Sequence, residues 1–201
     1  AQLVLNELAE GRAALLSHLF SGVAVSGHDA ASIDDRMPIS ARPSVILMNP
    51  PFSAMAHVAG RMQDAGFRHI SSALNRLAPG GRLVAITGAN VGPDLPDWRE
   101  AFIALQAKGR IVFSAAIDGS VFRKHGTTFP TRLTVIDKLP ADDGCVLPVS
   151  PGMAPDVATI LGWIEASVPP RLAVTLPVPV QSPAPAPKSV HGYLTRTAAN
   201  R

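Results

Sequence analysis

The chain of 201 residues is 47% hydrophobic and only 16% charged, which supports one domain with a sizeable buried core. The 18 Lys and Arg against 15 Asp and Glu give a net charge of +3, which permits a polyanionic partner without requiring one. Cys145 is the only cysteine, so a disulfide framework and a cysteine-rich zinc site are excluded and a reducing, cytoplasmic setting is favoured. No apolar run reaches the length of a membrane span, and no signal peptide pattern opens the chain.

The hydrophobic pattern predicts alternating strands and helices. Strands are expected at residues 2–6, 23–26, 45–48, 82–87, 110–116 and 132–137. Helices are expected at residues 8–20, 54–77 and 96–107, the second broken near Gly66 and ended by the PGG turn at 79–81. The strand at 45–48 is continuously apolar, as in a parallel sheet covered on both faces, and the alternation at 132–137 suggests an edge strand or a hairpin partner. This order predicts a doubly wound, mostly parallel α/β sheet closed by an antiparallel hairpin.

The two ends of the chain differ in composition from the middle. We expect one domain over residues 1–139, a C-terminal helical extension over 140–172 with its helix at 155–166, and a Pro-rich, disordered linker over 173–201. The apolar run already under way at the first residues suggests that sequence upstream has been lost.

Residues 49–52, Asn-Pro-Pro-Phe, directly follow the apolar strand VILM. In an open parallel sheet, ligands bind beyond the carboxyl ends of the strands. The two prolines have a fixed φ and no N–H, so this loop is stiff and its backbone offers only acceptors. Asn49 adds a side-chain carbonyl, and Phe52 adds a flat apolar face.

Two convergent acceptors beside an aromatic ring suit a planar group with an exocyclic amine, such as adenine or cytosine. Hydrogen bonds from both amine hydrogens to Asn49 Oδ1 and the Pro50 carbonyl would favour a pyramidal nitrogen with its lone pair exposed to an electrophile. Catalysis would then consist of orientation and electrostatic preorganisation, without a strong base. The competing interpretation is a rigid turn whose Phe52 fills the core.

The stretch MNPPF resembles motif IV of amino-group DNA methyltransferases, the N6-adenine and N4-cytosine enzymes that use S-adenosylmethionine; RNA and protein-glutamine methyltransferases share close variants. The resemblance implies a Rossmann-like class I methyltransferase fold in which Asn49, Pro50, Pro51 and Phe52 are catalytic and Asn49 also borders the cofactor. It further implies that Glu7 binds the ribose hydroxyls of the cofactor and that Asp29 accepts from its adenine amine. An acidic helix start and an ordinary turn aspartate are the competing interpretations of these two residues.

The resemblance extends over residues 2–172. HISSALNRLAPGGRLVAITG, at 69–88, resembles the helix, turn and strand that follow motif IV. The stretch from VLNELAEGRAALL to KHGTTFPTRLTVIDK resembles the methylase portion of bacterial methylase/helicase proteins of the strawberry-notch type, which implies a helicase-like region beyond the Pro-rich segment. The family's Gly-rich motif I, expected before Glu7, is absent, and GANVG at 88–92 follows the wrong strand. The fragment is therefore expected to bind cofactor weakly or not at all.

A polar, partly basic loop is the candidate contact for nucleic acid. Its residues are Arg123, Lys124, His125, Thr127 and Thr128. They would hold phosphates while Phe52 stacks a flipped base, although a solvated loop is equally open. The histidines show no metal-ligand spacing, so no metal site is expected.

The sequence therefore predicts an S-adenosylmethionine-dependent N-methyltransferase that acts on a nucleic-acid base, adenine N6 in DNA foremost and RNA as another substrate. Two alternatives stay open. One is a catalytically inactive, methyltransferase-like module that binds nucleic acid or docks within a larger helicase-containing protein. The other is methylation of a protein glutamine, whose amide presents the same NH₂ group.

Overall fold

The computed structural model describes residues 2–38, 42–50 and 65–174. The elements are, in chain order, β1 (Leu5–Asn6), α1 (Glu10–Leu19), β2 (Val25–Ser26), the 3₁₀ helix η1 (Ala30–Ser32), α2 (Ile33–Arg36), β3 (Val45–Met48), α3 (Ala65–Arg76), β4 (Arg82–Gly88), α4 (Pro96–Leu105), β5 (Arg110–Ile117), the 3₁₀ helix η2 (Gly119–His125), β6 (Thr131–Asp137), β7 (Met153–Ala154) and α5 (Val157–Ser167). The predicted strand and helix order is confirmed for the described residues. The first half of the helix expected at 54–77 lies outside them.

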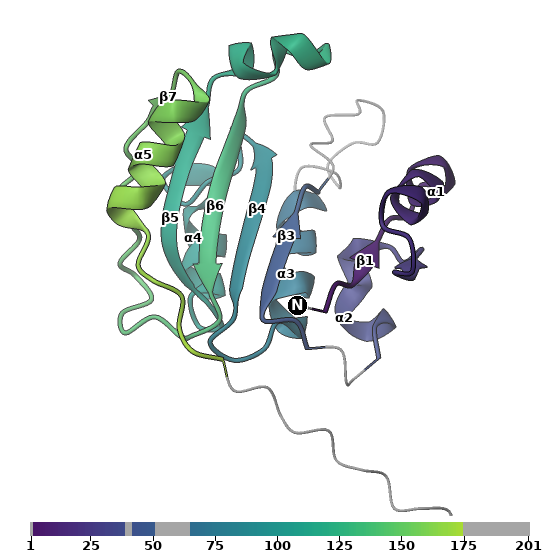
Figure 1. Ribbon diagram of the computed structural model, residues 1–201. Helices are drawn as coiled ribbons and strands as arrows, with labels where there is room; N and C mark the ends of the chain where they lie inside the picture. Colours follow the sequence, from purple (N-terminus) through teal and green to yellow (C-terminus); the bar gives the residue numbers. More distant parts are fainter. Residues whose placement is uncertain (1, 39–41, 51–64, 175–201) are drawn as a thin grey trace, which may run out of the picture.

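Five strands form the main sheet in the order β3-β4-β6-β5-β7, and β1 and β2 form a separate parallel pair (Figure 1). Strand β6 runs antiparallel between β4 and β5, so the predicted hairpin pairing with β5 is confirmed. The expectation of an edge strand is wrong, because β6 is interior. Its alternation arises from polar residues that are buried with partners: Arg132 pairs with Asp94, Thr134 bonds Ser114 and Asp137 pairs with Arg82.

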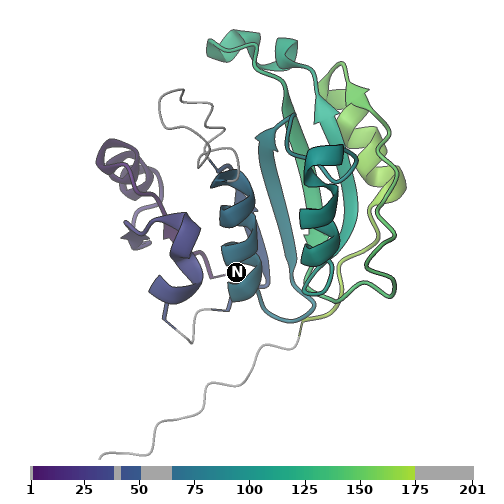
Figure 2. The same ribbon diagram turned by 180° about the vertical axis from the view of Figure 1, so that it is seen from behind.

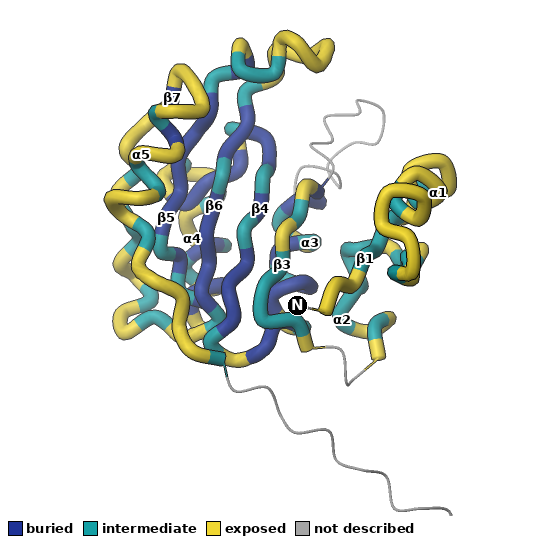
Figure 3. Tube along the Cα trace, in the orientation of Figure 1, coloured by how far each residue is buried: buried dark blue, intermediate teal, exposed yellow. Residues whose placement is uncertain are grey.

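Helices cover both faces of the main sheet, as a doubly wound fold requires (Figures 1 and 2). On one face, Ile70 and Leu74 of α3 and Phe102 of α4 pack on Leu83 of β4. On the other face, Ile160 of α5 packs with apolar residues of β5 and β6. Figure 3 shows the resulting core, with β4, β5 and β6 largely buried and α1 largely exposed.

The N-terminal elements contact the rest of the molecule through α2 and α3. Ser72 Oγ donates to Asp34 Oδ1 at 2.6 Å, and Asn75 Nδ2 donates to Asp34 Oδ2 at 2.9 Å. Arg76 also donates to the carbonyl of Met37. These contacts fix the two-stranded sheet beside α3, while α1 has no buried residue.

The two sheets face each other with unpaired edges. Strand β3 is the last strand of its sheet and pairs only with β4, while β1 pairs only with β2. Figure 1 shows β1 and β3 running in the same direction, so they end at the same end of the molecule as β4 and β5. We call this end the carboxyl edge. Leu47 of β3 is 76% exposed although it lies in a fully apolar strand.

No helix among the described residues combines the length and the apolar character that crossing a membrane requires.

Candidate functional site

Asn49 and Pro50 follow β3 directly at the carboxyl edge. Pro50 is buried, and its ring packs beside Gly66 at the start of α3: a Cβ added to Gly66 would lie 4.0 Å from Pro50 Cγ and 3.8 Å from Thr87 Cγ2. Asn49 is exposed, and within the described part of the chain its amide makes no hydrogen bond. The structure therefore combines a fixed proline with an amide that is open to a ligand. Pro51 and Phe52 lie outside the described residues.

Glu7 follows β1 at the same edge. Its backbone N–H donates to the Ser26 carbonyl at 2.9 Å, which extends the pairing of β1 with β2. Its Oε1 accepts from the Ala9 N–H at 2.8 Å and from Arg12 at 2.9 Å. The Arg12 guanidinium, followed by the Ala9 N–H, lowers the pKa of Glu7. Both of these hydrogen bonds go to Oε1, so Oε2 can accept from a ligand hydroxyl.

Asn6, which the sequence analysis did not select, fixes the loop that carries Asp29. Its Nδ2 donates to the His28 carbonyl at 2.9 Å, and its Oδ1 accepts from the His28 N–H at 2.9 Å. The Ser26 hydroxyl also donates to Asn6 Oδ1, at 2.8 Å. This two-way pairing ties the end of β1 to the loop after β2. An asparagine at a strand end, next to a candidate acid, was the available signal.

Asp29 is the cap of η1, and its side chain is 62% exposed. Oδ1 accepts from the Ala31 N–H at 2.9 Å, so the turn-aspartate interpretation is confirmed, and this geometry is compatible with a ligand at Oδ2. His69 Nε2 of α3 lies 3.8 Å from Oδ1, a contact that the sequence analysis missed because 40 residues separate the two. Burial is the main reason that the pKa of His69 is lowered, while Asp29 acts in the opposite direction. Neutral imidazole is therefore the main form at pH 7, and the contact is not a strong ion pair.

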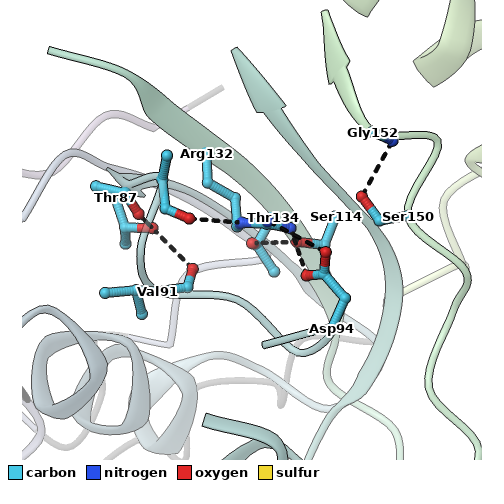
Figure 4. A network of polar contacts seen from close by, with 10 residues as sticks. Thr87, Val91, Asp94, Ser114, Arg132, Thr134, Ser150 and Gly152 are labelled. Atoms are coloured by element: carbon cyan, nitrogen blue, oxygen red, sulfur yellow. Dashed lines mark hydrogen bonds and ion pairs between the residues drawn. The ribbon is translucent and has the colours of Figure 1, made fainter. Parts of the chain in front are cut away.

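A buried network fixes the loop after β4 (Figure 4). Arg132 of β6 pairs with Asp94 at 2.7 Å and donates to Ser114 Oγ at 3.1 Å. Gly92 packs directly on this guanidinium, since an added Cβ would lie 2.5 Å from Arg132 Cζ. The glycine of GANVG thus serves packing on Arg132, in agreement with the prediction that this segment is not the cofactor turn.

The candidate nucleic-acid loop also lies at the carboxyl edge (Figure 1). Asp118 caps η2 by accepting from the Ser120 N–H at 2.8 Å, and this hydrogen bond lowers the pKa of Asp118. Gly126 ends η2 with φ +81°, and Gly119 is required because an added Cβ would lie 1.8 Å from the Thr128 carbonyl oxygen. The five candidate side chains are all exposed: Arg123, Lys124, His125, Thr127 and Thr128.

The structure thus places Glu7, Asp29, Asn49 and η2 on loops at one end of the sheets. These are acceptors and a basic loop, without a metal site: no group of three or more His, Cys, Asp or Glu in the described ranges could hold a metal ion. Carboxylate and amide oxygens at this edge can accept from hydroxyl and amine groups of a ligand.

No protein-family model matches the sequence. No curated protein matches it either. Among solved structures, the fold is similar to the M protein of the type I restriction enzyme EcoKI, with 18% identity, a TM-score of 0.52 and coverage of 71% of this chain and 33% of that protein. It is also similar to a protein from Listeria monocytogenes described as a class I S-adenosylmethionine-dependent methyltransferase, with 12% identity, a TM-score of 0.54 and coverage of 80% and 52%.

The chain spans a third of the first protein and about half of the second. At these identities the similarity concerns the fold, and it confirms the predicted Rossmann-like class I methyltransferase fold. The predicted resemblance to strawberry-notch-type proteins stays a prediction.

Proposed function

We propose that the chain is part of an S-adenosylmethionine-dependent N-methyltransferase that acts on an exocyclic amine of a nucleic-acid base, adenine N6 in DNA foremost. One observation carries this proposal: after β3, the exposed Asn49 amide stands beside the buried Pro50 at the carboxyl edge of a class I methyltransferase fold. This edge is where open α/β sheets bind ligands.

The residues at the edge fit parts of the cofactor. Glu7 Oε2 can accept from ribose hydroxyls, and the exposed Asp29 carboxylate can accept from an adenine amine. Asn6 holds the Asp29 loop in place through His28. When bound, S-adenosylmethionine supplies an electrophilic methyl group.

Asn49 and Pro50 supply the orientation of the amine. Asn49 Oδ1 and the Pro50 carbonyl each accept one of its two hydrogens, so the nitrogen lone pair points away from both oxygens toward the methyl donor. Phe52 completes the proposed motif by stacking the base, and Arg123 and Lys124 of η2 contact phosphates of the same strand. The chain's own contribution is thus orientation and electrostatic preorganisation.

A further parallel strand between β1 and β3, carrying the Gly-rich turn that is absent before Glu7, belongs to this proposal. Its support is that β1 and β3 run in the same direction, that neither has a partner on its facing edge among the described residues, and that Leu47 is 76% exposed. Backbone donors and acceptors of a strand are otherwise paired within a sheet.

The test measures methyl transfer from labelled S-adenosylmethionine to DNA by a protein that includes this preceding strand. We expect Asn49→Ala to lower kcat by about a hundredfold, as for the loss of one preorganised group. Asn90→Ala is the matched control, because Asn90 is an exposed asparagine on the neighbouring loop and should leave kcat unchanged. Equal incorporation by the Asn49→Ala form and the unsubstituted protein would exclude the proposed role.

The second candidate function is a catalytically inactive module that binds nucleic acid within a larger helicase-containing protein. Arg12 bound to Glu7, together with the missing Gly-rich turn, favours it. Calorimetry with S-adenosylmethionine on the protein with the preceding strand separates the two. Saturable binding supports the enzyme, whereas DNA binding without cofactor binding supports the module. Competition between adenine-containing DNA and a glutamine peptide then tests the third alternative.

A further inference from the structure

Three basic residues gather at the end of the main sheet opposite to the carboxyl edge, the lower end in Figure 1. Arg42 lies just before β3, and Lys108 lies just before β5. Lys138 follows β6, and because β6 is antiparallel to β4 and β5, its end lies at their beginnings. We call these three residues the amino-edge basic cluster.

Backbone hydrogen bonds fix the loops that carry the cluster. The Lys138 N–H donates to the Gly81 carbonyl at 2.7 Å, and the Lys138 carbonyl accepts from the Gly80 N–H at 2.9 Å. The adjoining Arg82 N–H donates to the Ser44 carbonyl at 3.0 Å, which places the segment after Arg42 beside the same turn.

Lys108 is fixed in a similar way. Its Nζ donates to Asn75 Oδ1 of α3 at 3.3 Å. The next residue, Gly109, packs tightly on the core, since an added Cβ would lie 2.8 Å from Leu74 Cδ2 and 2.9 Å from Ile136 Cγ2. The cluster therefore stands on rigid elements.

No carboxylate neutralises the cluster within the described part of the chain. The ion pairs there use Arg12, His69, Arg82, Arg110 and Arg132, and none includes a cluster member. Asp137, next to Lys138 in sequence, accepts from both Nε and Nη2 of Arg82, at 2.7 and 2.9 Å. Burial, followed by the charges of Lys108 and Arg42, lowers the pKa of Lys138. The three cations thus repel one another and lack an anion.

We propose that the amino-edge basic cluster binds the phosphate backbone of a nucleic-acid strand. Three cations on separate loops suit an anion whose charges repeat along a chain, and lysine binds phosphate as a point charge without reading sequence. The cluster lies at the end opposite to Asn49 and η2, so this contact goes beyond the proposed methyl transfer and does not depend on it.

The experiment measures the affinity of the 201-residue chain for a fluorescein-labelled 30-nucleotide single strand by anisotropy, without cofactor, from 50 to 200 mM NaCl. We expect Lys108→Gln/Lys138→Gln to weaken binding by at least about fivefold at 50 mM and to reduce the slope of log K against log salt by about 2, one for each lost contact. Lys108→Arg/Lys138→Arg keeps the charges and should bind within about twofold of the unsubstituted chain.

Arg99→Gln is the matched control, because Arg99 is an exposed cation on α4 outside the printed ion pairs and removes a charge of the same sign. Unchanged melting temperatures show that the variants are folded. The proposal is overturned if the double glutamine variant binds like the unsubstituted chain, or if Arg99→Gln has the same effect per charge. It is also overturned if polyglutamate of equal charge competes as well as unlabelled nucleic acid, since the cluster would then select acidic peptides.

Discussion

The guanidinium of Arg132 is the most deeply buried charge near the carboxyl edge, with its side chain 5% exposed, and its partner Asp94 is 35% exposed. Asp94→Ala leaves the buried cation unpaired, so we expect the free energy of unfolding to fall by about 2 kcal/mol, less than for a fully buried pair because Asp94 is partly solvated. Urea unfolding measures the change. Asp142→Ala breaks the exposed pair with Arg110 and should cost less than about 0.5 kcal/mol. Equal losses in the two variants would contradict the assigned role of burial.

Glu7 gives a prediction about pH. The Arg12 guanidinium lowers its pKa below the usual 4.5, so the pair contributes stability above pH 4.5 and this contribution is lost as the pH falls through the lowered value. In Arg12→Ala we expect the Glu7 pKa, measured by NMR titration, to rise toward 4.5. Arg36→Ala should leave it unchanged, since the printed contacts of Glu7 do not involve Arg36. A Glu7 pKa that does not move in Arg12→Ala would exclude the ion pair in solution.

The residues that lie directly after a strand could be predicted, whereas those that act through long-range contacts could not. Glu7 and Asn49 follow apolar runs, so their place at the carboxyl edge depends only on where β1 and β3 end. Asn6 bonds His28 across 22 residues, and His69 lies near Asp29 across 40. Such partners depend on tertiary packing that a single sequence does not encode locally.

At the scale of elements, one polar contact holds α2 on α3. Hydrogen bonds from Ser72, followed by Asn75, lower the pKa of Asp34. The contact should therefore be complete well above pH 3.8, the usual value, and be lost as the pH falls through the lowered pKa. We expect Ser72→Ala to increase the rate at which a protease cleaves within residues 1–38 at pH 7, because buried Ser72 supplies the shortest of these bonds.

Ser71→Ala is the matched control for this contact. Ser71 is the neighbouring serine on α3, and no printed hydrogen bond joins its side chain to α2. Cleavage rates measured by mass spectrometry should match those of the unsubstituted chain for Ser71→Ala. A faster cleavage in both variants would show that α3 itself is destabilised rather than the contact.

Strand β6 shows why element type was easier to predict than position in the sheet. The alternation at 132–137 indicated a strand correctly, and pairing with β5 followed from the short connection. Polar residues in that alternation normally face solvent, which suggested an edge. Here Arg132 and Asp137 are 4% and 5% exposed because Asp94 and Arg82 neutralise them, and neither partner is adjacent in sequence. Burial of paired charges thus moved the strand from the edge to the interior.

At the scale of the whole molecule, the division into two sheets leaves the outer edge of β3 without a strand. Amides of β3 that point away from β4 have no sheet partner, so in the 201-residue chain we expect alternate amides of residues 45–48 to exchange with deuterium much faster than the others. In a protein that includes the proposed preceding strand, all of them should be protected. Hydrogen exchange with NMR detection measures both states. Fast exchange of the same amides in both proteins would exclude a strand at this edge.

Leu47 provides a second measurement at the same place that does not depend on backbone exchange. Because its side chain is 76% exposed, Leu47→Asp should change the free energy of unfolding of the 201-residue chain by less than about 0.5 kcal/mol. With the preceding strand present, the side chain would be covered, and the same substitution should cost more than about 1.5 kcal/mol by burying an unpaired charge. Leu161→Asp on α5 is the control, since Leu161 is 51% exposed and lies on the far face of the main sheet. An effect of Leu47→Asp that is equally small in both proteins would show that the open edge belongs to the complete fold.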